Sequence, residues 1–174
     1  MEITKLFIKT VESIINYGDL IESNFNLPFE SSNSLKESEK FKIEIKKLKL
    51  AQNFAQKNLD KLAEIFESEE KINSLYIIDV HNTIFSLNSK TRYIYELKLA
   101  LKDSKLGFNQ ILSKIELIVI NEYIDDYFNK VEAIWKIIRL NNSKYPQYSI
   151  EYPLRLSDGN KILKSRFDVH IKEI

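Results

Sequence analysis

The clearest pattern in the chain is the stretch FKIEIKKLKLAQNFAQKNLDKLAEIF, which occupies residues 41–66. Its mostly apolar residues recur at alternating intervals of four and three, and this spacing aligns them along one side of an α-helix, as in coiled-coil packing. The pattern predicts a helix over about residues 35–68, with Ser34 and Glu37 as a capping box and Gln52 as the single polar break in the row. The row contains Phe41, Ile45, Leu48, Gln52, Ala55, Leu59, Leu62 and Phe66.

Two further helices are predicted downstream by the same kind of spacing. One covers about residues 72–102, with Lys90 as the weak member of its row, and the other covers about 108–141, with Trp135 beside its row. Short connections between long helices favour antiparallel neighbours. The rows are Tyr76, Val80, Thr83, Leu87, Lys90, Ile94, Leu97 and Leu101, and then Ile111, Ile115, Ile118, Tyr127, Val131, Ile134 and Ile138.

The chain begins with another predicted helix, over residues 2–22, in which apolar residues recur with a helical period. A loop is predicted at 24–34, because this stretch has no periodicity and is rich in turn-forming residues. Three Gly and three Pro in 174 residues leave little material for turns, so we expect few, long elements. The apolar positions of the first helix are Ile3, Phe7, Val11, Ile14, Ile15, Leu20 and Ile21.

The period changes after residue 142. Every even position from 148 to 156 is apolar, which predicts a β-strand, and Asp158-Gly159 is a favoured pair for a two-residue hairpin loop. This loop would place Ile150 opposite Phe167, with the apolar side chains of both strands on one side. The same register pairs Leu154 with Leu163, Tyr148 with Val169, and Glu151 with Arg166.

The predicted fold is therefore mainly α: an antiparallel bundle of about four long helices at 1–142, with a C-terminal β-hairpin at 143–174. The hairpin is either part of the same domain or an assembly element. An isolated two-stranded ribbon is at best marginally stable, and its apolar face is too large to stay in water. We expect this face to cover the bundle, or to bind a protein partner or a second copy. Its residues are Tyr148, Ile150, Tyr152, Leu154, Phe167, Val169 and Ile171.

Composition excludes several functional classes. The 26 basic and 25 acidic residues leave a formal charge of +1, which argues against a strongly basic nucleic-acid or membrane binder. The absence of Cys removes disulfides, thiolate nucleophiles and Cys-ligated metals. No stretch approaches the roughly 18–20 apolar residues of a membrane span, and the N-terminus lacks a signal-peptide core, so we expect a cytoplasmic protein. The dominance of Lys over Arg, with abundant Ile and Asn, suggests an AT-rich bacterial or viral genome.

Residues 77–85, IIDVHNTIF, resemble the first motif of haloacid-dehalogenase-like phosphatases, hydrophobic-Asp-x-Asp-x-Thr. His81 stands where that family has its second Asp, which acts there as the acid/base. The family also places the motif after a strand, whereas this stretch falls within a predicted helix. No catalytic role is carried over, and we expect His81 on or near the polar face of the helix.

Arg166 and His170 resemble the Arg–His ribonuclease motif of HEPN domains, which are compact helical bundles. The resemblance implies that Arg166 would bind phosphate. His170 would help to activate the ribose hydroxyl or protonate the leaving oxygen. Only three residues separate the two on a predicted strand, which places them about 13 Å apart. A solvated hairpin face is the other interpretation.

Three carboxylates, Glu122, Asp125 and Asp126, lie within one turn of the last predicted helix. Carboxylates so placed can share a divalent cation. Lys130 follows Asp126 by four residues, however, and this arrangement is typical of an exposed helix face. We therefore expect a solvated face and no metal or other cofactor.

The predicted function is that of a non-enzymatic helical-bundle interaction or assembly protein. The alternative is a nucleic-acid-directed protein, which is either a basic-faced binder of RNA or DNA or a degenerate HEPN-like ribonuclease using Arg166 and His170. The binder would use a basic spot on the second helix, although interleaved acids favour a solubilising face there. The residues of this spot are Lys46, Lys47 and Lys49.

Overall fold

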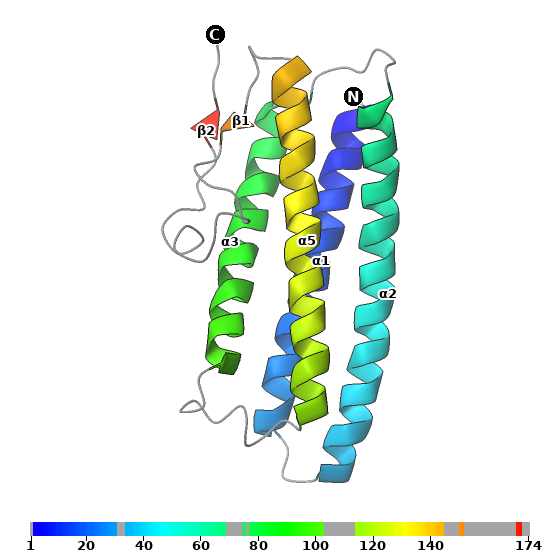
Figure 1. The fold of residues 1–174 in the computed structure, drawn as a ribbon, viewed down its shortest axis with the longest axis vertical. Helices are drawn as coiled ribbons and strands as arrows, with labels where there is room; N and C mark the ends of the chain where they lie inside the picture. The colour runs from blue at the N-terminus through cyan, green and yellow to red at the C-terminus, as the bar shows by residue number, and fades with distance from the viewer. Residues whose placement is uncertain are drawn as a thin grey trace.

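A computed structural model describes residues 2–30, 34–68, 75, 77–102, 114–144, 150–151 and 170–171. Within these residues, four long α-helices pack together: α1 (Glu2–Glu30), α2 (Ser34–Glu67), α3 (Ile77–Lys102) and α5 (Lys114–Lys144). Consecutive helices run in opposite directions, and α2 and α3 each pack against both α1 and α5 (Figure 1). The predicted antiparallel bundle is confirmed. Among the described helices, none has the length and apolar character needed to cross a membrane.

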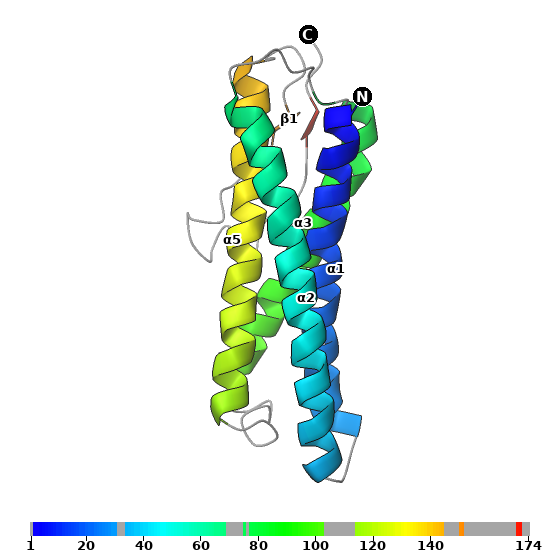
Figure 2. The same ribbon diagram turned by 90° about the vertical axis from the view of Figure 1, so that its right-hand side faces the viewer.

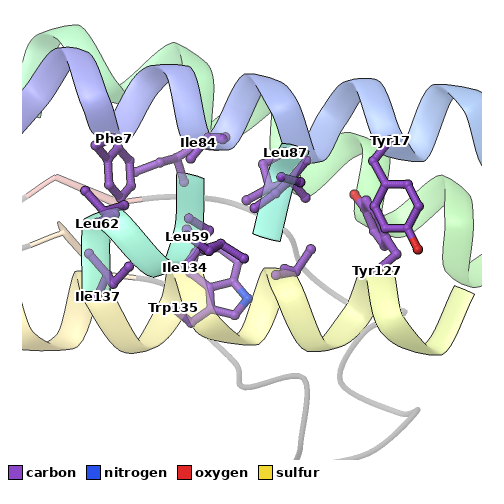
Figure 3. Packing of buried hydrophobic residues seen from close by; sticks show 14 of the residues in the cluster. Phe7, Tyr17, Leu59, Leu62, Ile84, Leu87, Tyr127, Ile134, Trp135 and Ile137 are labelled. Carbon is purple, nitrogen blue, oxygen red and sulfur yellow. The ribbon is translucent and has the colours of Figure 1, made fainter. Parts of the chain in front are cut away.

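The core lies along the axis of the bundle and receives side chains from all four helices. Phe7, Leu62, Ile84 and Ile134, one from each helix, meet in one cluster (Figure 3). The row predicted on α2 faces this core and forms the inner row of the helix: from Leu48 onward, each of its apolar members is buried. The buried members of the other predicted rows are Ile3, Phe7, Val11, Ile14 and Ile21 of α1, Val80, Leu87, Ile94 and Leu101 of α3, and Tyr127, Val131, Ile134 and Ile138 of α5.

One predicted core position on α5 is wrong. The side chain of Ile118 is 51% exposed, whereas Ile120 and Ile124 are buried and continue the four–three spacing back from Tyr127. Two residues along an α-helix turn the side chain by about 200°, so Ile118 and Ile120 point to opposite sides. The sequence IELIVI at 115–120 is apolar at nearly every position, so its pattern is compatible with more than one buried face.

The end of the first helix also differs from the prediction. The loop expected from residue 24 is wrong as far as residue 30, because α1 continues to Glu30 and includes Pro28. Just before this stretch α1 still contacts α2, since Ser23 Oγ donates to Glu44 Oε2 at 3.4 Å. Turn-forming composition is a weak guide where two helices still pack together, because tertiary contacts override propensity.

Side chains near the end of α5 contact the backbone of Leu75, just before α3, and the backbone at the end of α2. The predicted helix start at 72 is wrong, because Leu75 lies outside any helix and α3 begins at Ile77. The backbone N–H of Leu75 donates a hydrogen bond to Asn141 Oδ1 at 3.1 Å. Lys144 Nζ donates to the carbonyl oxygen of Phe66 at 3.3 Å, and a lysine so placed satisfies a carbonyl at the C-terminus of α2. These contacts account for the extension of α5 three residues beyond the predicted 141.

Two short antiparallel strands, β1 (Ile150–Glu151) and β2 (His170–Ile171), lie near the end of the bundle at which α5 ends (Figure 1). Ile150 is opposite Ile171, and Glu151 is opposite His170. The predicted pairings of Ile150 with Phe167 and of Glu151 with Arg166 are therefore wrong by four residues. Side-chain alternation has a period of two, so it does not distinguish registers that differ by an even number. The hairpin between these strands lies outside the described residues.

Candidate functional site

The most connected polar site is a layer inside the bundle that joins α1, α2 and α5. Asp126 Oδ2 accepts hydrogen bonds from the Tyr17 hydroxyl and from Gln52 Nε2, both at 2.9 Å. Lys130 Nζ lies 3.0 Å from the same oxygen and donates to Gln56 Oε1 at 2.8 Å. The Lys130 ammonium also lies 5.8 Å from the centroid of the Tyr17 ring. One carboxylate and one ammonium thus hold three helices together.

Electrostatics keeps the phenol of Tyr17 protonated. Burial raises its pKa far above the ordinary value of about 10, and the charge of Asp126 and the hydrogen bond to it raise it further. Burial likewise raises the pKa of Tyr127, whose hydroxyl is paired with Thr91 Oγ1 at 3.1 Å. Tyr17 and Tyr127 face each other in the core (Figure 3). Both act as neutral hydrogen-bonding groups near pH 7, and neither is poised as a base or nucleophile.

A second ionic site joins α1 to α3. Lys90 Nζ is paired with Asp19 and Glu22 of α1. Burial alone would lower the pKa of Lys90, but the hydrogen bonds and charges of these two carboxylates outweigh it and raise the pKa above its ordinary value. The aliphatic part of Lys90 lies over Gly18, where an added Cβ would come within 2.9 Å of Lys90 Cγ and 3.0 Å of Tyr127 Cε2. Gly18 therefore allows α1 to approach its neighbours closely.

The cluster of three carboxylates predicted on α5 does not act as one site, because Asp125 and Asp126 pair with different lysines. Asp125 pairs with Lys98 of α3 at 2.7 Å, and Asp126 belongs to the buried layer. The expectation that Lys130 lies on an exposed face is wrong, since only 3% of this residue is exposed. The helical spacing from Asp126 gives the ion pair, but contacts with α1 and α2 bury its lysine, while the Asp126 side chain is 30% exposed. In the described residues, no group of three or more His, Asp or Glu side chains is arranged to hold a metal ion.

The basic residues predicted on α2 and His81 of α3 do not form a common site. Lys46, Lys47 and Lys49 are exposed on α2, and Lys47 pairs with Glu44 at 3.3 Å. His81 lies within α3, which does not match the strand-borne motif of the phosphatases. It is partly exposed, with a buried Nδ1 that has no hydrogen-bond partner. The prediction that His81 lies on or near the polar face is thus only partly correct.

The predicted C-terminal sites lie mostly outside the described residues. Among the alternative ribonuclease pair, only the backbone of His170 is described, in β2, and Arg166 is not. The predicted partner-binding face is described only at the backbones of Ile150 and Ile171, which pair with each other. Its remaining residues, Tyr148, Tyr152, Leu154, Phe167 and Val169, are outside the description.

Sequence reasoning missed Tyr17 of the polar layer and the close packing at Gly18 beside Lys90. Tyr17 lies three residues after Ile14 and four before Ile21, so its spacing marks it as a core position. Gly18, one residue further, has no neighbour in sequence that signals the close approach of α3 and α5. Comparison of the chain with protein-family models, with curated proteins and with solved structures finds no match. The geometry of the chain itself is the basis for a functional interpretation.

Proposed function

We propose that this protein is a non-enzymatic interaction or assembly protein built on a helical bundle. The observation that carries the proposal is the set of large apolar side chains that remain at least half exposed on three of the helices. Single exposed side chains of this kind are common in monomeric soluble proteins, whereas an aligned group such as the three on α2 marks a surface that binds other chains. The set consists of Ile43, Leu50 and Phe54 of α2, Phe85 and Tyr93 of α3, and Ile118 of α5.

The interior polar groups support the same proposal. Asp126, Lys130 and Lys90 are engaged in contacts between helices, and the buried phenols remain protonated. Such contacts specify how helices pair and in which register, as buried polar residues do in coiled coils. In this proposal the polar layer fixes how the helices pair, and the exposed apolar residues bind other chains.

The test of this proposal is light scattering on the intact chain and on a chain that ends at Lys144. We expect the intact chain to self-associate or retain its native partner through the predicted face at 148–173, and the shortened chain to lose that association while remaining folded. Ending at Lys144 keeps the contacts of Asn141 and Lys144 with Leu75 and Phe66. If both chains are folded monomers and both retain the partner, the C-terminal segment is not an assembly element.

A nucleic-acid-directed function is the second candidate, and the exposure of Lys46, Lys47 and Lys49 within one turn of α2 favours it. Binding through these lysines would weaken as salt is raised, because phosphate contacts release counterions. Titration of labelled RNA and DNA at two salt concentrations tests this binding. The ribonuclease form predicts RNA cleavage in EDTA that is lost in Arg166→Ala or His170→Ala. We expect no cleavage by the wild-type protein.

A further inference from the structure

The outward side of α2 carries an apolar row of its own. Ile43, Leu50 and Phe54 are 54%, 71% and 50% exposed, and they form the outer row of this helix. Their spacing of seven and four residues keeps them within about 40° of one another around the helix and nearly opposite the inner row. The outer row extends over about 16 Å of the helix. α2 runs along the front of the bundle in Figure 2.

Lysines border the outer row unevenly, with Lys42, Lys46, Lys49 and Lys57 on one side and Lys47 on the other. Residues 42–57 contain five Lys and one acidic residue, Glu44, so this stretch has a formal charge of +4 (5 − 1), whereas the whole chain has +1. Glu44 already interacts with Lys47 and Ser23. From α1, Lys9 Nζ lies 5.7 Å from the centroid of the Phe54 ring. The five lysines of the border on α2 are all exposed: Lys42, Lys46, Lys47, Lys49 and Lys57.

The row and its border match the requirements of one kind of partner. Spacings of seven and four residues are those of a helix-binding seam, in which anchor side chains recur along one face. Positive charge beside the seam, most of it on one side, selects negative charge beside the partner's apolar row. Beyond Lys57 the exposed residues Asp60, Glu64 and Glu67 reverse the sign of the surface. The complementary surface therefore ends near residue 57 and is about 24 Å long.

A second copy of this helix fits poorly. In a parallel pair each lysine of the border would face itself. In an antiparallel pair with Leu50 opposite Phe54, Lys47 would face Lys57, and Ile43 would face Lys61. Like charges placed opposite each other disfavour an interface. A nucleic acid would use the lysines but leave the outer row without a role.

We propose that the outer face of α2 binds an acidic amphipathic helix of about four turns from a partner protein. This inference rests on the proposed function, because it names the partner of an interaction protein. The apolar row of the bound helix packs on Ile43, Leu50 and Phe54, and its flanking carboxylates pair with the lysine border.

Binding of a labelled synthetic peptide to the full-length chain tests the proposal. The probe is a helix of about four turns with Leu at heptad positions and Glu on both sides, and the matched probe has Lys in place of each Glu. We expect fluorescence anisotropy to detect the acidic probe and not the basic one. Leu50→Glu should weaken binding at least tenfold, and Lys46→Glu with Lys49→Glu should weaken it and reduce its salt dependence.

The control variant is Ser86→Glu, which introduces the same charge at an exposed position of α3 outside the proposed binding surface. It should leave peptide binding unchanged, and the thermal midpoint of Leu50→Glu should match that of the wild type. Equal binding of both probes, or binding unaffected by Leu50→Glu, overturns the proposal. Binding to phosphatidylglycerol vesicles or RNA without binding to the acidic probe overturns it in favour of a membrane or nucleic-acid surface. If the acidic probe fails while the intact chain still associates through 148–173, this inference fails and the proposed function stands.

Discussion

The two faces of α2 have the same helical period and opposite environments. On the inner row Leu48, Leu59 and Leu62 are covered by the other helices, whereas on the outer row Leu50 is 71% exposed. Both rows consist mostly of large apolar residues at heptad-like spacing, and the inner row also contains Gln52 and Ala55 at its centre. The outer row differs in lying among lysines. A heptad pattern thus identifies surfaces that pack on helices, but it does not say which of them the chain covers by itself.

The largest expected effect separates the two rows directly. Leu59→Ala should destabilise the protein by about 2–5 kcal/mol, because it leaves a cavity among buried side chains. Leu50→Ala removes the same atoms from an exposed position and should change stability by no more than about 0.5 kcal/mol. Urea denaturation of both variants gives the comparison, with Lys57→Ala as an exposed control. Equal losses in Leu59→Ala and Leu50→Ala would show that the assignment of the two faces is wrong.

The next effect compares a buried lysine of α5 that contacts α2 with a lysine on the outer face of α2. Lys130→Ala removes the cation of the buried layer and leaves Asp126 and Gln56 without its hydrogen bonds, at a cost of about 1–3 kcal/mol. Lys47→Ala breaks the ion pair with Glu44 on the outside, and exposed pairs contribute about 0–1 kcal/mol. Thermal unfolding of the two variants measures the difference. A midpoint for Lys130→Ala as high as that of Lys47→Ala would argue against a structural role for the layer.

Gly18→Ala tests how closely α1 approaches α3 and α5 inside the bundle. Alanine favours the helix by about 1 kcal/mol relative to glycine, but its Cβ would meet Lys90 Cγ and the buried ring of Tyr127. Overpacking costs typically about 1–3 kcal/mol, so we expect a net loss of about 1 kcal/mol in chemical denaturation. Lys90→Ala removes one of the two obstructions, so Gly18→Ala should cost less in that background. A gain in stability from Gly18→Ala alone would mean that α1 is not in close contact there.

The smallest effect is a pH dependence to which the buried phenols of Tyr17 and Tyr127 contribute. The pKa values of Tyr17 and Tyr127 are raised in the folded protein, whereas in the unfolded chain a phenol ionises near pH 10. Above about pH 10 the unfolded state therefore holds fewer protons than the folded state, and stability falls as pH rises. Tyr17→Phe should make this fall shallower in urea titrations between about pH 10 and pH 11.5. Tyr93→Phe, on a half-exposed residue, should leave it unchanged, and identical slopes in wild type and Tyr17→Phe would contradict the assignment.

The same contrast explains which features of the interior were predictable. Gln52 was visible as the polar break of the inner row, and it does contact Asp126. The pair of Asp126 and Lys130 was visible as a spacing of four residues, but its burial was not. Tyr17 and Asp126 are 109 positions apart in the chain, so nothing local indicates that they meet. The outer row was hidden in the sequence because the lysines around it suggested only a solubilising face.

The sequence by itself determined that α2, α3 and α5 are helices, the bounds of α2 to within one residue, the inner row and the antiparallel bundle. These follow from local physics, because an α-helix repeats every 3.6 residues and a chain with three Gly and three Pro offers few turns. Only the tertiary structure decided that α1 continues to Glu30, that Ile120 and not Ile118 is buried, and that Lys130 lies inside. Each of these depends on side chains from distant parts of the chain, whose contacts outweigh the small local preferences of single residues.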